Sequence, residues 1–451
     1  MNDLTQGHVG RLIFRFTIPI LLGNIFQQLY QIIDSIIVGH YLGKEALAAV
    51  GASFPIIFLV LSFTIGIAMA GTVIVSQYFG AKDYDGVKRS IDTLNIFLVV
   101  AAVVIATLSI IFSESIFKLM RLPGEIIPPA QSFFNVMMLG TVFSFGFNGT
   151  TAVLRGMGDS KTPLYFLITS TLINIILDVI FIVGFRWGIA SVAWATVISQ
   201  GCAFGALILY LNKRHAIIKF NPSDIRFDKN IFIKSLKIGL PVGLQQTFVA
   251  LGMMALMVIV NSFGTNVIAA YAVAWRIDSF ASMPGMNLAI ALSAFVGQNM
   301  GAQRADRVMT GLKATLLMAG TVALLMSIVA YGWGDYMMRL FTNDAEVIAI
   351  GHQYLKIVGM FYLAFNFMFV IGSVMRGAGD TFIPMLISLF SLWIVRLPLA
   401  FILSKHFNEI GIWWSIPIGW IIGTLLSYAY YKMGRWKNKV IVKRKEIVLE
   451  P

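Results

Sequence analysis

Long uninterrupted apolar runs dominate the sequence, many of them longer than the roughly 20 residues with which an α-helix crosses a bilayer core. A membrane-spanning β-strand needs only about 10 residues, with apolar and polar side chains in alternation, and that alternation is missing here. Charged residues make up 12% of the chain, about half the fraction that is usual in soluble domains. The sequence therefore predicts an all-α polytopic membrane protein.

Glycine, proline and clusters of charge divide the apolar runs into twelve predicted transmembrane helices in two sets of six. The expected ranges are 12–38, 46–79, 91–115, 128–154, 162–184, 187–211, 231–262, 267–299, 312–335, 346–375, 380–404 and 410–433. The start of the chain lacks the pattern of a cleaved signal peptide, so the first range is expected to remain as a span. We expect these domains: an N-terminal lobe (1–211), a cytoplasmic linker (212–230), a C-terminal lobe (231–433) and a basic cytoplasmic tail (434–451).

The distribution of Lys and Arg predicts the orientation of the chain. When the loops are assigned to alternate sides, 25 basic residues fall on the side of the termini and central linker, and 7 on the other. The positive-inside rule then places both termini in the cytoplasm. The net charge of +13 is accordingly assigned to loops that face anionic lipid, and no nucleic acid partner is expected.

The two halves repeat each other at a constant offset. LRGMGDSKTP (154–163) recurs as MRGAGDTFIP (375–384), and SQYFGAKDYD (76–85) recurs as GQNMGAQRAD (297–306). Because each half holds an even number of spans, both enter the membrane in the same direction, which predicts a pseudo-twofold axis along the membrane normal. The RGxGD segments lack the full phosphate-loop pattern, and we interpret them as tight turns.

An aspartate stands inside the first predicted span, in QIIDSIIVG. It completes a set of polar residues spaced 3, 4 and 3 apart, and hence on one helix face: Asn24, Gln27, Gln31 and Asp34. An acid at the centre of a transmembrane helix costs about 2.5 kcal/mol or more and so requires a partner or a task. Hydrogen bonding between helices is the structural alternative, but four polar groups favour a hydrated face.

A second polar stripe lies in STLINIILDVIFIV, where Thr171, Asn174 and Asp178 are spaced 3 and 4 apart. The offset between the halves pairs Asp34, Asn174 and Asp178 with apolar residues only, namely Ala255, Val395 and Leu399. The acid pair therefore belongs to the first half alone, which favours a functional role over a repeated structural one.

The second half contains other polar residues within its spans: Gln245, Arg276, Asp278 and Arg396. Arg276 and Asp278 are two positions apart on a helix and do not face each other, so each needs a partner elsewhere. A buried structural network and contact with a substrate are both open interpretations. These four residues and the three amide residues of the first span are our candidates for the lining of a substrate cleft.

Motifs for other chemistry are missing from the sequence. It contains no Walker motif, HExxH, CxxC cluster or GxSxG, and Cys202 is its single cysteine. We therefore expect neither an enzyme nor an ATP-driven pump, and no cofactor.

The two six-span halves, together with IPILLGNIFQQLYQIIDSIIVGHYLG, LRGMGDSKTP, NIILD and FVGQNMGA, resemble the multidrug and toxic compound extrusion family of transporters. The match looks closest to the bacterial DNA-damage-inducible branch. The resemblance implies two helical bundles around a central cleft. It also implies export of cationic or amphipathic organic compounds in exchange for H⁺ or Na⁺, and a location in a prokaryotic inner membrane.

The family's cation-coupling residues match four positions of this sequence: Asp34, Asn174, Asp178 and Thr196. Two carboxyls close together in a low-dielectric setting can hold a proton near neutral pH. The same four residues supply oxygen ligands, so they would form a metal site if the coupling ion is Na⁺. An acid that some members carry in the seventh helix is missing from GLPVGLQQTFVALGMMALMVIV, so no mechanism that uses it applies here.

The leading hypothesis is a monomeric, ion-coupled exporter of organic cations in the lipid bilayer. A flippase for lipid-linked sugars or lipids, from the same wider superfamily, is the alternative. Such a protein would be expected to line its cavity with several basic residues, whereas only Arg276 and Arg396 lie well inside the spans. A channel is less compatible with the duplication and the one-sided acid pair.

Overall fold

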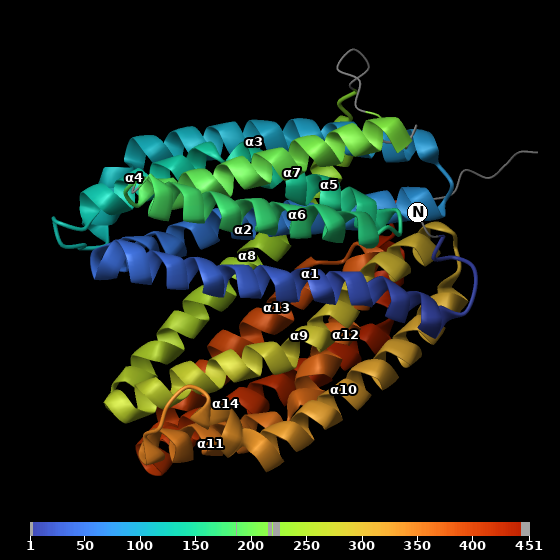
Figure 1. Ribbon diagram of the computed structural model, residues 1–451. Helices are drawn as coiled ribbons and strands as arrows, with labels where there is room; N and C mark the ends of the chain where they lie inside the picture. Colours follow the sequence, from blue (N-terminus) through green and yellow to red (C-terminus); the bar gives the residue numbers. More distant parts are fainter. Residues whose placement is uncertain (1–2, 186, 215–218, 220–225, 443–451) are drawn as a thin grey trace, which may run out of the picture. The chain divides into compact units, whose positions relative to one another are not determined.

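The computed structural model describes residues 3–185, 187–214, 219 and 226–442, and these residues are almost entirely helical (Figure 1). Fourteen α-helices and several short π- and 3₁₀-helices account for the secondary structure of this part of the chain, which contains no strand. The predicted all-α class is confirmed.

The first of two compact units contains residues 18–243, apart from those that the structure does not describe. Within it α2 packs against α3, α4 and α5, while α6 packs against α7. Ile67, Leu94, Phe134 and Phe145 are among its fully or almost fully buried core residues. Its helices are α1 (Val9–Ile37, from residue 18), α2 (Gly43–Gly80), α3 (Tyr84–Leu119), α4 (Ile127–Leu139), α5 (Thr141–Gly156), α6 (Lys161–Asp178), α7 (Ala190–Arg214) and the start of α8 (Lys229–Asn261).

The second unit comprises residues 3–17 and the chain from 244 onward. Within it α9 packs against α10, α11 and α12, and α12 packs against α14. Trp413, Tyr354 and Leu355 lie at the centre of its core. Its helices are the first part of α1, the remainder of α8, α9 (Thr265–Gly301), α10 (Ala305–Arg339), α11 (Ala345–Gly359), α12 (Tyr362–Ala378), α13 (Phe382–Leu389) and α14 (Leu397–Met433).

The helices of the described chain agree with twelve spans. Nine stretches are long and apolar enough to cross a bilayer, and two bent pairs, α4 with α5 and α11 with α12, bring the number to eleven. The last stretch, Phe382–Met433, is 52 residues long and has non-helical backbone at Phe407 and Asn408. This break falls between the predicted ranges 380–404 and 410–433, so the stretch contains both.

The duplication is visible in the backbone of each unit. Three residues with left-handed φ in the first unit have counterparts at the repeat offset in the second, with φ of similar size. The pairs are Gly43 and Gly264 (80° and 92°), Lys82 and Gln303 (60° and 59°), and Gly158 and Gly379 (81° and 102°). Left-handed φ is uncommon outside glycine, so its recurrence at Gln303 indicates inherited loop geometry. Gly158 and Gly379 lie in the RGxGD segments, which confirms the interpretation of these segments as turns.

The unit boundaries fall inside helices α1 and α8. The boundary within α1 lies between Thr17 and Ile18, and that within α8 lies between Gly243 and Leu244. Each boundary is close to a proline, Pro19 in α1 and Pro241 in α8. The lobes predicted from sequence, 1–211 and 231–433, differ from these units in where they place residues 3–17 and 231–243.

Helix α2 and the first part of α8 approach each other closely at glycines. A Cβ atom at Gly66 would collide with the carbonyl oxygen of Gly239 and lie 2.7 Å from the backbone nitrogen of Gly243. Both neighbours are backbone atoms, so neither can move aside without moving a helix. A Cβ atom at Gly51, earlier in α2, would have no neighbouring atom within 4 Å.

We expect Gly66→Ala to destabilise the protein by about 1–3 kcal/mol, because overpacking a fixed helix contact strains the backbone. Gly51→Ala is the matched control in the same helix, and it should be neutral or stabilising because alanine favours helix. Denaturant unfolding of the detergent-purified variants measures both. Equal stability of the two variants would contradict the close contact.

Candidate cation-coupling site

Two acidic side chains meet inside the first unit. Asp34 is on α1, and Asp178 is the last residue of α6. Their carboxyl groups lie within hydrogen-bonding reach of each other. Asp178 is 1% exposed, and Asp34 is partly buried. A deprotonated carboxyl has only acceptor oxygens, so a hydrogen bond between the two requires that one of them hold a proton.

Asn174 and Thr196 surround Asp178. The amide of Asn174 satisfies both of its ends in one orientation, in which Nδ2 donates to Asp178 Oδ2 over 2.9 Å and Oδ1 accepts from the Thr196 backbone N–H over 3.1 Å. Asn174 is one helical turn before Asp178, so α6 itself sets the spacing of this pair. The side chain of Thr196, on α7, is 7% exposed.

Tyr30 is a fifth member of this group that the sequence analysis missed. Its hydroxyl lies 3.1 Å from Thr196 Oγ1. Because Thr196 Oγ1 donates to the Val192 carbonyl over 3.1 Å, the tyrosine is the donor in this contact. Tyr30 is one helical turn before Asp34 and therefore on the same helix face, a spacing that could have identified it.

Both acids are followed by a short π-helix. The π-helix η1 (Val38–Leu42) begins one helical turn after Asp34, and η2 (Val179–Gly184) begins directly after Asp178. The two segments contact each other. Single π-helical turns occur often at functional sites, because they change the direction of the side chains that follow.

Some hydrogen-bonding capacity at the acid pair is unused. Within the described part of the chain, the Oδ1 atoms of Asp34 and Asp178 are buried without a hydrogen-bond partner. Buried carboxyl oxygens without partners are costly, so they favour the uptake of a proton or a small cation. The oxygens of Asp34, Asp178, Asn174 and Thr196 are of the kind that binds Na⁺. No cluster of three or more His, Cys, Asp or Glu side chains suited to a metal occurs among the described residues.

The remaining residues of the α1 polar face are more accessible. Gln27 and Gln31 are exposed, and Asn24 is partly buried. These amides are therefore not part of the buried group around Asp178, although they precede Asp34 on the same helix.

The candidate cleft residues of the second unit differ from one another in how exposed they are and in which side chains surround them. Arg276 is exposed, whereas Asp278 and Arg396 are 9% and 8% exposed. The Asp278 carboxyl lies among the hydroxyls of Tyr354 and Tyr362 and within the electrostatic field of Arg396. The structure thus separates Arg276 from Asp278.

Gln245 occupies a third environment. It is 8% exposed, and its amide nitrogen Nε2 donates to Ser388 Oγ over 2.6 Å. This hydrogen bond joins α8 to α13, and it involves neither Asp278 nor Arg396.

Comparison with known proteins agrees with a duplicated transporter fold. The MatE family model matches residues 19–180 and again residues 241–402. Two Bacillus subtilis proteins, named probable multidrug resistance proteins YpnP and YoeA, are each 34% identical to this chain. The alignment with YpnP covers 96% of this chain and 97% of YpnP, and that with YoeA covers 96% of each.

Solved structures show the same fold. A crystal structure of a MATE protein with a proline-to-alanine substitution superposes with a TM-score of 0.91 at 23% identity, covering 97% of this chain and 98% of that one. A multidrug resistance MATE transporter in an outward-facing conformation gives a TM-score of 0.90 at 24% identity, with the same coverage.

The described chain has two repeats of apolar helices, as expected for a polytopic membrane protein of duplicated design, and the MATE family is a family of transporters and not of enzymes. The two matches to the family model make the assignment specific: this chain belongs to the MatE family. Transporters of this family need no cofactor. The DNA-damage-inducible branch stays a prediction.

A proton shared between the two acids has a spectroscopic consequence. We expect an infrared C=O stretching band of a protonated carboxyl that both Asp34→Asn and Asp178→Asn remove, since each variant takes away one half of the pair. Difference spectra of the reconstituted protein at neutral pH measure it. Loss of the band in only one variant would mean that the acids do not share a proton.

Proposed function

We propose that this transporter exports cationic or amphipathic organic compounds in exchange for H⁺ or Na⁺, by alternating access. The observation that carries the proposal is the pair of facing carboxyls, Asp34 and Asp178, in a buried part of the first unit. The names of relatives support the export function. YpnP and YoeA are named probable multidrug resistance proteins, and a Staphylococcus aureus relative at 24% identity is named multidrug export protein MepA.

The acid pair can act as the coupling site because it is stable only when its charge is partly neutralised. Two carboxylates at hydrogen-bonding distance repel each other strongly in a medium of low dielectric constant. A proton removes this repulsion by neutralising one acid. Na⁺ could remove it by binding oxygens of both acids, with further ligands from Asn174 and Thr196.

Binding of the coupling ion would change which conformation of the transporter is preferred. An ion shifts such an equilibrium only if its affinity differs between the two states. Asp34 and Asp178 are on different helices, so a movement of α1 relative to α6 would alter the distance between the carboxyls. The adjoining π-helices, η1 and η2, are where we expect such a change to be accommodated.

The substrate would be bound by residues other than the coupling acids. Our candidates remain Asn24, Gln27, Gln31, Gln245, Arg276, Asp278 and Arg396. The exposed amides of Gln27 and Gln31 are available for contact with a substrate. The negative charge of Asp278 would attract an organic cation.

The charge bias of the loops supports an orientation with both termini in the cytoplasm, as part of the proposal. The bacterial origin of the relatives supports a location in the cytoplasmic membrane. Export against a gradient would then use the ion gradient across that membrane.

Efflux of a fluorescent organic cation from energised membrane vesicles tests the function. The proton and sodium gradients are dissipated in separate experiments. We expect transport to stop when one of them is lost, and the effective treatment identifies the coupling ion. Transport that survives the loss of both gradients would reject ion-coupled export.

Site variants test the residues. Asp34→Asn and Asp178→Asn should each lower coupled efflux at least about tenfold, since removal of a charged partner from a hydrogen-bonded pair costs about 1.5–3 kcal/mol. Glu114→Gln is the control, because Glu114 is 57% exposed and pairs with Lys118 on α3. Full efflux by both aspartate variants would reject the coupling site.

A further inference from the structure

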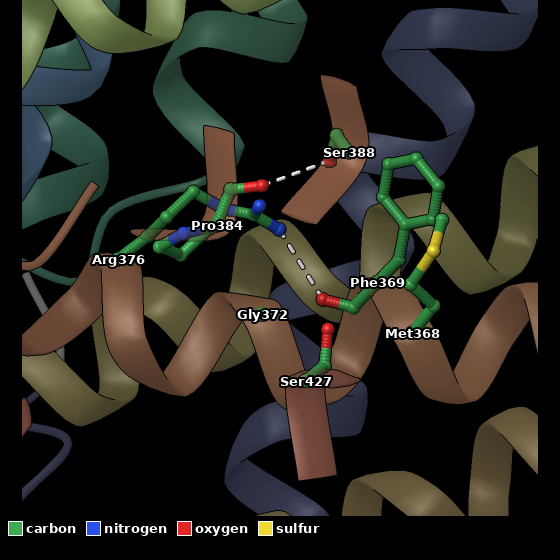
Figure 2. Close-up of a pocket in the computed structure, with 7 residues that line it drawn as sticks. All are labelled: Met368, Phe369, Gly372, Arg376, Pro384, Ser388 and Ser427. Carbon is green, nitrogen blue, oxygen red and sulfur yellow. Dashed lines mark hydrogen bonds between the residues drawn. The ribbon is translucent and has the colours of Figure 1, made fainter. Parts of the chain in front are cut away.

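A pocket in the second unit is lined by a partly buried arginine and two hydroxyls, and its lining includes neither Asp278 nor Arg396. Figure 2 shows this lining, which comes from α12, α13 and α14. About 10 Å³ of the pocket is accessible to the centre of a water-sized sphere, and the space around it is continuous with open solvent. The lining residues are Met368, Phe369, Gly372, Arg376, Pro384, Ser388 and Ser427.

Among the described residues, the guanidinium of Arg376 has one hydrogen-bond partner, a backbone carbonyl. Nη2 donates to the Phe369 carbonyl over 3.2 Å, the interaction drawn as a dashed line in Figure 2. Within the described part of the chain, no carboxylate oxygen lies within 4.0 Å of this group. A partly buried guanidinium has five N–H donors and a permanent charge, so a bound anion would stabilise it.

Gly372 provides the space in which the guanidinium lies. A Cβ atom at Gly372 would be 3.3 Å from Nη1 of Arg376, closer than side chains normally pack. The absence of a side chain at this position thus keeps one side of the charged group open.

Ser427 supplies a second donor from another helix. This residue is 3% exposed, and its hydroxyl makes no hydrogen bond to any residue that the structure describes. Figure 2 shows its oxygen directed toward the space beside Phe369 and Gly372. A hydroxyl that faces a pocket can donate a hydrogen bond to a ligand there.

Ser388 is the third polar group of the lining. Its hydroxyl donates to the Pro384 carbonyl over 2.9 Å and accepts from Gln245 Nε2. Gln245 is 8% exposed, so this contact fixes Ser388 against α8 while the serine faces the pocket.

The first unit provides an internal comparison. At the repeat offset Arg376 corresponds to Arg155, but Ser388 and Ser427 correspond to Leu167 and Ala206, which carry no hydroxyl. The arginine is thus common to both halves and the two serine hydroxyls are specific to the second, whereas Gly372 corresponds to Thr151, which carries a hydroxyl of its own.

We propose that this pocket binds a phosphoryl group through Arg376 and Ser427, with Ser388 at its edge. A planar guanidinium donates two parallel hydrogen bonds to phosphate oxygens, and a hydroxyl from a different helix can reach a third oxygen. Arg376 is in the last turn of α12, where a predicted span ends and where phospholipid phosphates would lie. The phosphoryl group can belong to an anionic lipid or to a free phosphate. This site is independent of the coupling acids.

Lipid and phosphate binding to the full-length protein tests the proposal. The protein is placed in nanodiscs of phosphatidylcholine, with phosphatidylglycerol or inorganic phosphate added, and the bound species are counted by native mass spectrometry. We expect saturable binding, weakened about tenfold by Arg376→Gln and about threefold by Ser427→Ala, in keeping with charged and neutral hydrogen bonds.

Arg155→Gln is the matched control, because it removes the equivalent arginine from surroundings in which the positions of Ser388 and Ser427 carry no hydroxyl and that of Gly372 is filled by Thr151. Binding should change less than about twofold. Ser427→Ala also serves as the control for a folding defect. Its unfolding temperature without ligand should equal that of the unchanged protein. Retention of phosphatidylglycerol alone identifies a lipid headgroup, and binding of both probes or of phosphate alone identifies a more general phosphoryl site. No binding of either probe, or an equal loss in the Arg155 and Arg376 variants, would overturn the proposal.

Discussion

The hydrocarbon core of the bilayer provides no water to satisfy backbone N–H and C=O groups, and this constraint determines the architecture. Each span must therefore be a helix whose backbone bonds are internal. Apolar side chains then cost nothing on the outer surface, so the polar ones inside the spans are exceptions that require a reason. In the first unit that reason is contact between acids on two helices. In the second, an arginine and two hydroxyls surround an open pocket.

The sequence was sufficient to predict the fold class, the twelve spans and the duplication, because all three depend on hydropathy and on repeated motifs. Spacing predicted that Asn174 and Asp178 share a helix face, whereas the grouping of Asp34, Asn174, Asp178 and Thr196 came from the family resemblance. The hydrogen bond that links Asn174 to Asp178 follows from their separation of one helical turn. The contact between α1 and α6 does not, since helix spacing carries no information about which helices are neighbours.

Other features were out of reach for specific physical reasons. Tyr30 was missed because an aromatic side chain in an apolar span is usually a packing or lipid-facing residue, and its hydroxyl becomes informative only beside Thr196. The π-helices after both acids have no recognisable local sequence pattern. The boundary positions inside α1 and α8 depend on which side chains pack together in three dimensions, whereas the polar linker only marks where the chain is hydrophilic.

Helices α1 and α8 each continue without interruption from one unit into the other. Their covalent connection is therefore rod-like, unlike a flexible loop, and a change of orientation between the units must bend or twist a helix. Pro19 and Pro241 lack the N–H that would close a backbone hydrogen bond, so bending costs least near them. In the alternating access proposed above, the mechanical properties of two short helical segments, and not the length of the polar linker, would then limit how far and how fast the units reorient.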